Sequence, residues 1–231
     1  MDSAERLRRV GERAAAEIVD GMIVGLGTAS TAEAMVRAVG IRVADGLKMT
    51  GIATSERTAE LARSLDIPLV ALDDVDRIDL CIDGADEINP DVDVVKGRGG
   101  ALLYEKLVAR QADRYIIIAS HEKLVAKLGV RLPLPVEVVP VGWKYTGESI
   151  AKLGVTQKLR LTAAGDAYVT DGGHYIFDCD APAGGFADPG GLATALKAIV
   201  GVVEHGLFIG MADLALTIDE DGIVTETSRP R

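Results

Sequence analysis

Short apolar runs alternate with helix-like patterns through the first half of the chain. Strands are predicted at residues 22–27, 47–54, 67–72, 77–85 and 114–120. Helices are predicted over an amphipathic N-terminal stretch and at residues 30–40, 55–66 and 101–112. Strands separated by helices of about ten to fifteen residues imply a parallel sheet with helices on both faces. We therefore expect a Rossmann-like α/β domain.

The pattern changes in LGVRLPLPVEVVP, residues 128–140, where three prolines fall in a short window. Beyond it the predicted order is strand, helix (148–154), strand (156–162), strand (174–180), helix (190–200) and strand (203–208). That order is typical of a small α+β module of the ferredoxin-like kind. We predict an α/β catalytic domain of residues 1–129 and 208–231 and an inserted α+β lid or oligomerisation domain of residues 130–207. The tail is expected to return to the first sheet.

Composition narrows the function classes. The chain has 231 residues, 48% of them hydrophobic, and a formal net charge of −10, which argues against nonspecific nucleic-acid binding. Cys81 and Cys179 lie far apart, and packed thiols in a reducing compartment are a better interpretation than a disulfide. No apolar run approaches the roughly 20 residues of a membrane span, and the N-terminus lacks a signal-peptide pattern. We expect a soluble, cytoplasmic protein.

Glu105, in KGRGGALLYEK, is the most informative single residue. On a helix its nearest face neighbours are all apolar: Ala101, Leu102, Val108, Ala109 and Ala112. Burial would favour its neutral form, whereas the helix N-terminus and Lys96 would favour its charged form. A carboxylate under such opposed influences suits a general base. A structural salt bridge is the alternative.

Two further motifs lie at predicted turns. GLGTAST, residues 25–31, joins a strand to a helix, and its glycines, hydroxyls and helix N-terminus suit a phosphate, although a tight turn with a Ser/Thr cap explains it equally well. DLCIDGADEI places Asp79, Asp83, Asp86 and Glu87 near a strand's end, where α/β sheets bind ligands. Those acids could hold magnesium or calcium, or simply cap turns and helices. The three histidines have no zinc-ligand spacing.

GLGTAST, IDGADEI, KGRGGALLYEK and LPLPVEVVP, in this order, resemble the type A ribose-5-phosphate isomerases. The resemblance includes TSERTAELARSLDIPL, TDGGHYIFDC and GLFIGMADLAL, and so extends over nearly the whole chain. It implies reversible conversion of ribose 5-phosphate to ribulose 5-phosphate, in the non-oxidative branch of the pentose phosphate pathway, without metal or organic cofactor. It also implies a homodimer or homotetramer.

The resemblance assigns roles to individual residues. Glu105 would be the base that moves a proton from C2 to C1, Asp83 and Asp86 would line the sugar and assist proton movement, and Lys96 would stabilise the enediolate. The remaining substrate-binding positions are Thr28, Ala29, Ser30, Thr31, Gly84, Ala85, Gly97, Arg98, Gly99 and Lys123. Of these, Thr28 to Thr31 would hold the phosphate.

The chain departs from the family pattern at several positions. Ala29 and Arg98 stand where glycine is usual, and His121 with Glu122 replaces an Ala/Asp-rich turn. These departures bear on ligand geometry more than on reaction type. Two other functions fit a similar fold. A sugar-phosphate-sensing regulator would need a DNA-reading helix pair and a basic surface. An amino-sugar phosphate deaminase or lactonase would be expected to carry a histidine in its motif loops. The sequence shows neither feature.

Overall fold

The computed structural model describes residues 1–230, which form two compact units. Unit 1 comprises Met1–Ala85, Tyr104–Lys123 and the tail from Met211, and unit 2 comprises Asp86–Leu103 and Leu124–Gly210. Residues 86–103 thus belong with the second unit, whereas we expected them in the first domain. The physical reason is strand pairing, because β5 (Val94–Val95) pairs with β11 (Leu207–Phe208) and with β4 (Glu87–Ile88).

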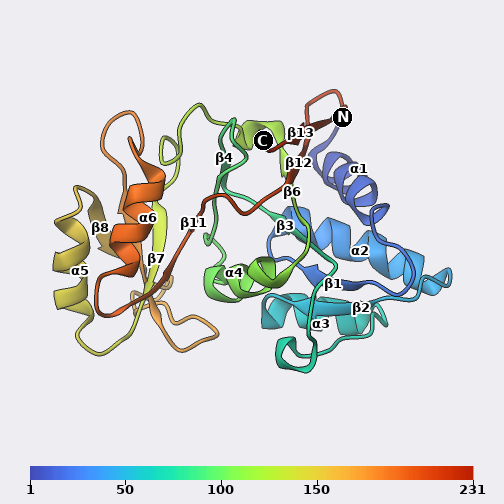
Figure 1. The fold of residues 1–231 in the computed structure, drawn as a ribbon, viewed down its shortest axis with the longest axis horizontal. Helices are drawn as coiled ribbons and strands as arrows, with labels where there is room; N and C mark the ends of the chain where they lie inside the picture. The colour runs from blue at the N-terminus through green and yellow to red at the C-terminus, as the bar shows by residue number, and fades with distance from the viewer. Residues whose placement is uncertain (231) are drawn as a thin grey trace. The chain divides into compact units, whose positions relative to one another are not determined.

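Unit 1 is built on a six-stranded sheet of order β13-β12-β6-β3-β1-β2 (Figure 1). Its strands are β1 (Ile23–Leu26), β2 (Thr50–Ala53), β3 (Leu80–Gly84), β6 (Tyr115–Ser120), β12 (Leu214–Ile218) and β13 (Val224–Ser228). All neighbours are parallel except β12 and β13, which are antiparallel. The predicted Rossmann-like sheet and the return of the tail to it are confirmed.

Helices cover both faces of this sheet. They are α1 (Ser3–Ala15), α2 (Ser30–Ala44), α3 (Glu56–Ser64) and α4 (Leu102–Gln111). On one face, Val10 of α1 and Met35 of α2 are fully buried in a cluster with Leu26 of β1, and burying a side chain of this size contributes about 1.5–3 kcal/mol. The opposite face carries α4, since a Cβ added to Gly25 would lie only 2.5 Å from Cγ1 of Val108.

The prediction of a strand at residues 67–72 is wrong. Leu69 forms a single bridge with Gly51, and the chain then turns into a short 3-10 helix, η1 (Leu72–Asp74). The Pro68 carbonyl accepts the N–H of Gly51 (2.7 Å) and the N–H of Val70 donates to the Gly51 carbonyl (3.0 Å), but Pro68 has no N–H of its own to donate, and the pairing ends after Val70.

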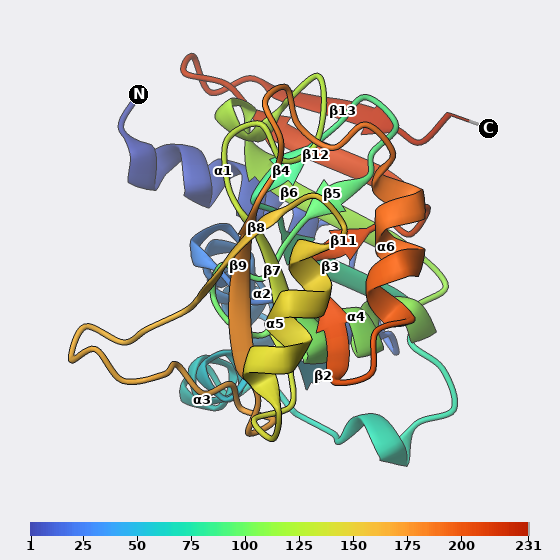
Figure 2. The ribbon, with the colours of Figure 1, turned by 90° about the vertical axis from the view of Figure 1, so that its left-hand side faces the viewer.

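Unit 2 contains a four-stranded antiparallel sheet of order β10-β7-β9-β8. Its elements in chain order are β7 (Leu134–Val138), α5 (Trp143–Ala151), β8 (Thr156–Leu159), β9 (Tyr175–Asp180), α6 (Pro189–Lys197) and β10 (Val202–His205). Counted along the chain, the strands lie in the order fourth, first, third, second, which confirms the ferredoxin-like prediction. Helices α5 and α6 pack on one face through Ile150 and Leu196 (Figure 2). A separate three-stranded sheet has the order β11-β5-β4.

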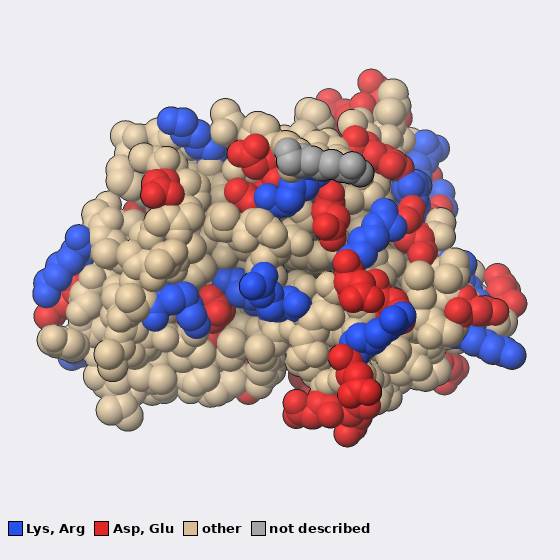
Figure 3. All heavy atoms as spheres, in the orientation of Figure 1, with Lys and Arg blue, Asp and Glu red and all other residues tan. Residues whose placement is uncertain are grey.

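Acidic and basic side chains alternate over the surface drawn in Figure 3, and acidic ones gather over η1, where Asp73 and Asp74 are exposed. The described residues on this face therefore form no continuous basic surface of the kind that nucleic-acid-binding proteins use. Among residues 1–230, no helix has both the length and the apolar character needed to cross a membrane.

Cys179 of β9 is a titratable thiol buried in the core of unit 2. Both cysteines of the chain are free thiols, as predicted. Burial raises the pKa of the Cys179 thiol from 9.0 to about 12. Between pH 9 and 12 the thiol stays protonated in the folded protein but loses its proton in the unfolded chain. The contribution of this group to the free energy of unfolding is therefore fully present below pH 9 and is lost as the pH rises through this window. We expect the free energy of unfolding to fall by up to about 1.4 kcal/mol per pH unit from this group. Urea unfolding of wild type and Cys179→Ala between pH 8 and 11 checks this, and parallel curves would contradict it.

Helix α2 begins after a strained residue. Ala29 has φ 127° and ψ 169°, a region that residues other than glycine hardly ever adopt, at a cost of about 1–3 kcal/mol. We therefore expect Ala29→Gly to stabilise the protein by about 1 kcal/mol, because relief of this strain exceeds the added entropy of the unfolded chain. The matched control is Ala34→Gly inside α2, which should destabilise by about 1 kcal/mol. The denaturant midpoint of each variant, compared with wild type, shows whether the substitution stabilises or destabilises the protein. Destabilisation by Ala29→Gly would refute the strain argument.

Candidate active site

The carboxylate of Asp83 fixes the loop that follows β1. Asp83 is fully buried near the end of β3, and its Oδ1 accepts hydrogen bonds from the N–H groups of Thr28 (3.0 Å) and Gly84 (2.7 Å). A Cβ on Gly27 would lie 2.2 Å from the same oxygen, so this close approach requires glycine. The predicted pocket residues Thr28, Asp83 and Gly84 are therefore brought together.

A second set of contacts holds the side chain of Thr28. Its Oγ1 lies 2.8 Å from Thr54 Oγ1, 2.8 Å from Ser55 Oγ and 3.1 Å from Thr58 Oγ1, and all four residues are buried. Thr58 also donates its hydroxyl to the carbonyl of Gly27 (3.0 Å). Nothing in the sequence indicated that Thr54, Ser55 and Thr58 contact this loop. The hydroxyls anchor the loop to the start of α3.

The first turn of α2 continues from this anchored loop. Ala29 and Ser30 are exposed and Thr31 is half-buried, and no side chain caps the helix. The first N–H groups of a helix have no intrahelical acceptor and favour an anion. The predicted anion loop therefore lies at a rigid helix N-terminus, beside Asp83.

Glu105 occupies the first turn of α4 and is only 4% exposed. Its predicted face neighbours Leu102, Val108 and Ala109 are buried too, which confirms the helix-face argument. Charged side chains are rarely buried to this extent unless they are paired or functional.

Tyr115 lies at the start of β6, beside Cys81 of β3. Its side chain is buried, and burial raises its pKa well above the usual value, with further contributions from Asp83, Cys81 and Glu105. Sequence reasoning did not single out this tyrosine, because a lone aromatic in an apolar strand carries no functional signal.

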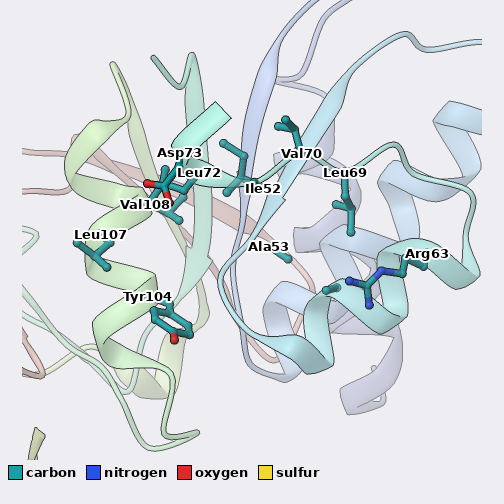
Figure 4. Close-up of a pocket in the computed structure, with 12 residues that line it drawn as sticks. Ile52, Ala53, Arg63, Leu69, Val70, Leu72, Asp73, Tyr104, Leu107 and Val108 are labelled. Atoms are coloured by element: carbon teal, nitrogen blue, oxygen red, sulfur yellow. The ribbon is translucent and has the colours of Figure 1, made fainter. Parts of the chain in front are cut away.

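Other residues of α4 face a separate cavity of about 590 Å³ in unit 1. Figure 4 shows Tyr104, Leu107 and Val108 on α4 opposite Arg63 of α3. The lining of this cavity includes none of the predicted site residues within the described chain. Glu105 is not among the residues that line it, although its face neighbour Val108 is.

Lys123 ends the short helix η2 (His121–Lys123), which follows β6 directly, and is half-buried. Since β1, β3 and β6 are parallel, the segments that follow them meet at one edge of the sheet. In unit 1 this edge carries the Thr28–Thr31 loop, Asp83, Gly84, Ala85 and Lys123.

Unit 2 carries the remaining predicted residues: Asp86, and four that lie on residues 96–100, which we call the glycine-rich loop. The N–H of Arg98 donates to Oδ2 of Asp86 (3.0 Å). Gly97 and Gly100 have φ values of 103° and 84°, so the loop depends on glycine at both positions. Asp86, Gly97, Arg98 and Gly99 are therefore held in one local structure.

Lys96 opens the glycine-rich loop and is only 2% exposed. Its N–H donates to the carbonyl of Gly206 (2.8 Å), and its Nζ lies 5.8 Å from the ring centroid of Phe208. A Cβ on Gly206 would lie 2.1 Å from the Lys96 carbonyl oxygen, so β11 approaches this residue closely. Lys96 is therefore buried rather than solvated.

Two acids of the DLCIDGADEI motif have structural partners. Asp79 precedes β3 and accepts a hydrogen bond from the N–H of Ile23 (2.8 Å). This bond, and to a lesser extent the guanidinium of Arg77, lowers the pKa of Asp79. Glu87 is fully buried and accepts the N–H groups of Gly129 (2.5 Å) and Arg131 (2.7 Å). Both therefore orient backbone, as the turn-and-cap interpretation expects. Among residues 1–230 no group of three or more His, Cys, Asp or Glu side chains is arranged as a metal site.

Comparison with known proteins agrees with this geometry. Residues 50–222 match the family model of ribose 5-phosphate isomerase A (phosphoriboisomerase A). Ribose-5-phosphate isomerase A of Synechococcus sp. (strain JA-3-3Ab) is 53% identical over 228 residues, which cover 97% of this chain and 98% of that protein. The protein of the same name from Thermomicrobium roseum is 50% identical over 235 residues, with 97% and 98% coverage.

Solved structures give the same result. Ribose 5-phosphate isomerase from Plasmodium falciparum is 34% identical with a TM-score of 0.95, covering 99% of this chain and 100% of that one. A D-ribose-5-phosphate isomerase in complex with phospho-erythronic acid is 34% identical with a TM-score of 0.94 and the same coverage. This chain therefore belongs to the ribose 5-phosphate isomerase A family.

Proposed function

We infer that this chain is an intramolecular oxidoreductase that interconverts D-ribose 5-phosphate and D-ribulose 5-phosphate, and we propose Glu105 as its base. The family membership supports the reaction. One observation supports the base: Glu105 is a carboxylate only 4% exposed, on a face of α4 that is otherwise apolar. A sensing regulator, a deaminase and a lactonase are not favoured, because the relatives of high identity are isomerases.

The proposed chemistry acts on the open-chain aldose. Glu105 takes the proton from C2, the electron pair of that bond forms the C1–C2 double bond of an enediolate, and the proton is then delivered to C1. The proton of the C2 hydroxyl moves to O1 in the same sequence. Asp83 and Asp86 are proposed to line the sugar and pass protons between hydroxyls. A positioned general base contributes about 10²- to 10⁴-fold to such a reaction.

Lys96 is proposed to stabilise the negative charge that develops on the enediolate oxygens. A buried ammonium at that position acts in a surrounding of low dielectric, where one preorganised donor contributes roughly 10²- to 10³-fold. Gly97, Arg98 and Gly99 are proposed to bind the sugar, as are Gly84 and Ala85.

The phosphate is proposed to bind at the start of α2. The N–H groups of Ala29, Ser30 and Thr31 and the hydroxyls of Ser30 and Thr31 are proposed as the donors, and the N–H of the preceding Thr28 is held by Asp83. Lys123 supplies a positive charge at the same edge of the sheet. A relative of known structure binds phospho-erythronic acid, itself a phosphorylated sugar acid. Binding the phosphate, which is remote from C1 and C2, positions the flexible open chain.

We further propose that the enzyme acts in the cytoplasm, as a homodimer or homotetramer, in the non-oxidative branch of the pentose phosphate pathway. It is proposed to need neither a metal nor an organic cofactor, so wild-type activity is expected to persist in EDTA.

We expect Glu105→Gln to lower kcat by 10² or more while the protein stays folded, because the amide cannot accept the C2 proton. Ketose formation from ribose 5-phosphate in EDTA measures this. The matched control is Glu60→Gln, an exposed glutamate of α3, which should retain wild-type rates. Wild-type kcat in folded Glu105→Gln would remove Glu105 as the base, and an inactive wild type would remove the reaction itself.

A further inference from the structure

The glycine-rich loop, residues 96–100, needs restraint from outside itself. Three of its five residues are glycine, whose backbone loses more conformational freedom on ordering than that of any other residue. Under the proposed function this loop presents Lys96 and the residues that follow it to the substrate. A misplacement of about 1 Å in such groups can cost 10²-fold in rate.

Arg160, which directly follows β8, supplies that restraint. Its Nη1 donates to two consecutive carbonyls of the loop, those of Gly97 (3.1 Å) and Arg98 (3.1 Å). The side chain is 14% exposed. In a trans peptide the N–H points away from the C=O, so fixing the Arg98 carbonyl on Arg160 fixes the Gly99 N–H in the opposite direction.

Asp178 of β9 holds the other edge of the same guanidinium. Its Oδ2 accepts from Nε of Arg160 (3.0 Å) and its Oδ1 accepts from Nη2 (2.5 Å). This bidentate pair engages two of the three nitrogens, and the third reaches the loop. Arg160 therefore cannot rotate away from the loop without breaking the pair. A lysine could satisfy Asp178 or the loop but could not reproduce the planar fork.

Tyr168 adds a second contact from the same hairpin. Its hydroxyl lies 3.4 Å from the Gly99 carbonyl oxygen, and its ring lies 5.8 Å from the Arg160 guanidinium. A Cβ on Gly100 would lie 2.3 Å from that hydroxyl oxygen, so Tyr168 approaches the loop backbone closely.

A cavity of about 310 Å³ within unit 2 lies beside the loop, and its polar lining consists of Asp86, Arg98, Arg160 and Asp178. Leu132, Pro133 and Pro135 complete the lining. The contacts of Arg160 therefore act on the loop in addition to apolar packing.

We propose that Arg160, held by Asp178 and assisted by Tyr168, is a positioning residue for the isomerisation. The three side chains form a clamp that fixes the peptide planes of the glycine-rich loop. The expected effect of the clamp on kcat/KM rests on the proposed function. Its expected effect on the order of the loop does not.

Two measurements on Arg160→Gln test the clamp. Amide hydrogen exchange in peptides covering residues 96–101 should become faster with little change elsewhere, and kcat/KM for ribose 5-phosphate should fall by roughly 10- to 100-fold. Arg160→Lys should not restore either value. Arg160→Gln/Asp178→Asn should be no slower than Arg160→Gln alone, because Asp178 acts through Arg160.

The matched control is Lys158→Gln. Lys158 lies on the same strand pair and forms an exposed ion pair with Asp180 (3.0 Å), so its loss should leave exchange and kinetics unchanged. If Arg160→Gln does not fold, Tyr168→Phe carries the test, with faster exchange at Gly99 and Gly100 and a smaller loss of kcat/KM.

The clamp is overturned if amide exchange in the loop is unchanged in folded Arg160→Gln. If Arg160→Gln does not fold, unchanged exchange in Tyr168→Phe overturns it instead. Wild-type kcat/KM with a loosened loop also overturns it as a positioning device. A wild type inactive on ribose 5-phosphate would instead refute the proposed function, and the exchange data would still decide whether the clamp orders the loop.

Discussion

The buried carboxylate of Asp83 is the contact around which the edge of unit 1 is organised. A charge taken out of water is tolerated only with hydrogen-bonding partners, and Asp83 finds two of them in the N–H groups of Thr28 and Gly84. Those bonds tie the end of β3 to the loop after β1, and Gly27 leaves space for the oxygen. Together with the hydroxyl contacts of Thr28, these bonds fix the direction of the loop and the start of α2.

Both units use the same physical solution for the groups assigned to the reaction. A flexible backbone segment is held by polar side chains from distant parts of the chain: the hydroxyls of Thr54, Ser55 and Thr58 in unit 1, and the guanidinium of Arg160 in unit 2. Fixed donors need no reorganisation during the reaction, and that is why preorganisation contributes to rate. Strain at Ala29 fits this picture, because the surrounding contacts impose a backbone conformation that alanine disfavours.

Patterns of short range in the sequence predicted much of this architecture. Alternating strands and helices predicted the parallel sheet, and the apolar neighbours of Glu105 predicted its buried position on α4. Contacts between distant residues were not predictable. Nothing in an isolated Arg160 distinguishes it from an ordinary surface arginine, because its role comes from folding next to Gly97. The segment at residues 67–72 looked like a strand because it is apolar, yet its pairing at the sheet edge ends after Val70.

We propose that this protein breaks the C2–H bond of ribose 5-phosphate by proton transfer to a buried carboxylate, and we expect that step to limit a single turnover. The decisive measurement is single-turnover conversion of ribose 5-phosphate carrying hydrogen or deuterium at C2, because product release does not enter the rate. The deuterated sugar should react more slowly with the wild-type enzyme. Equal rates for the two sugars would show that removal of the C2 proton does not limit the chemistry, against this expectation.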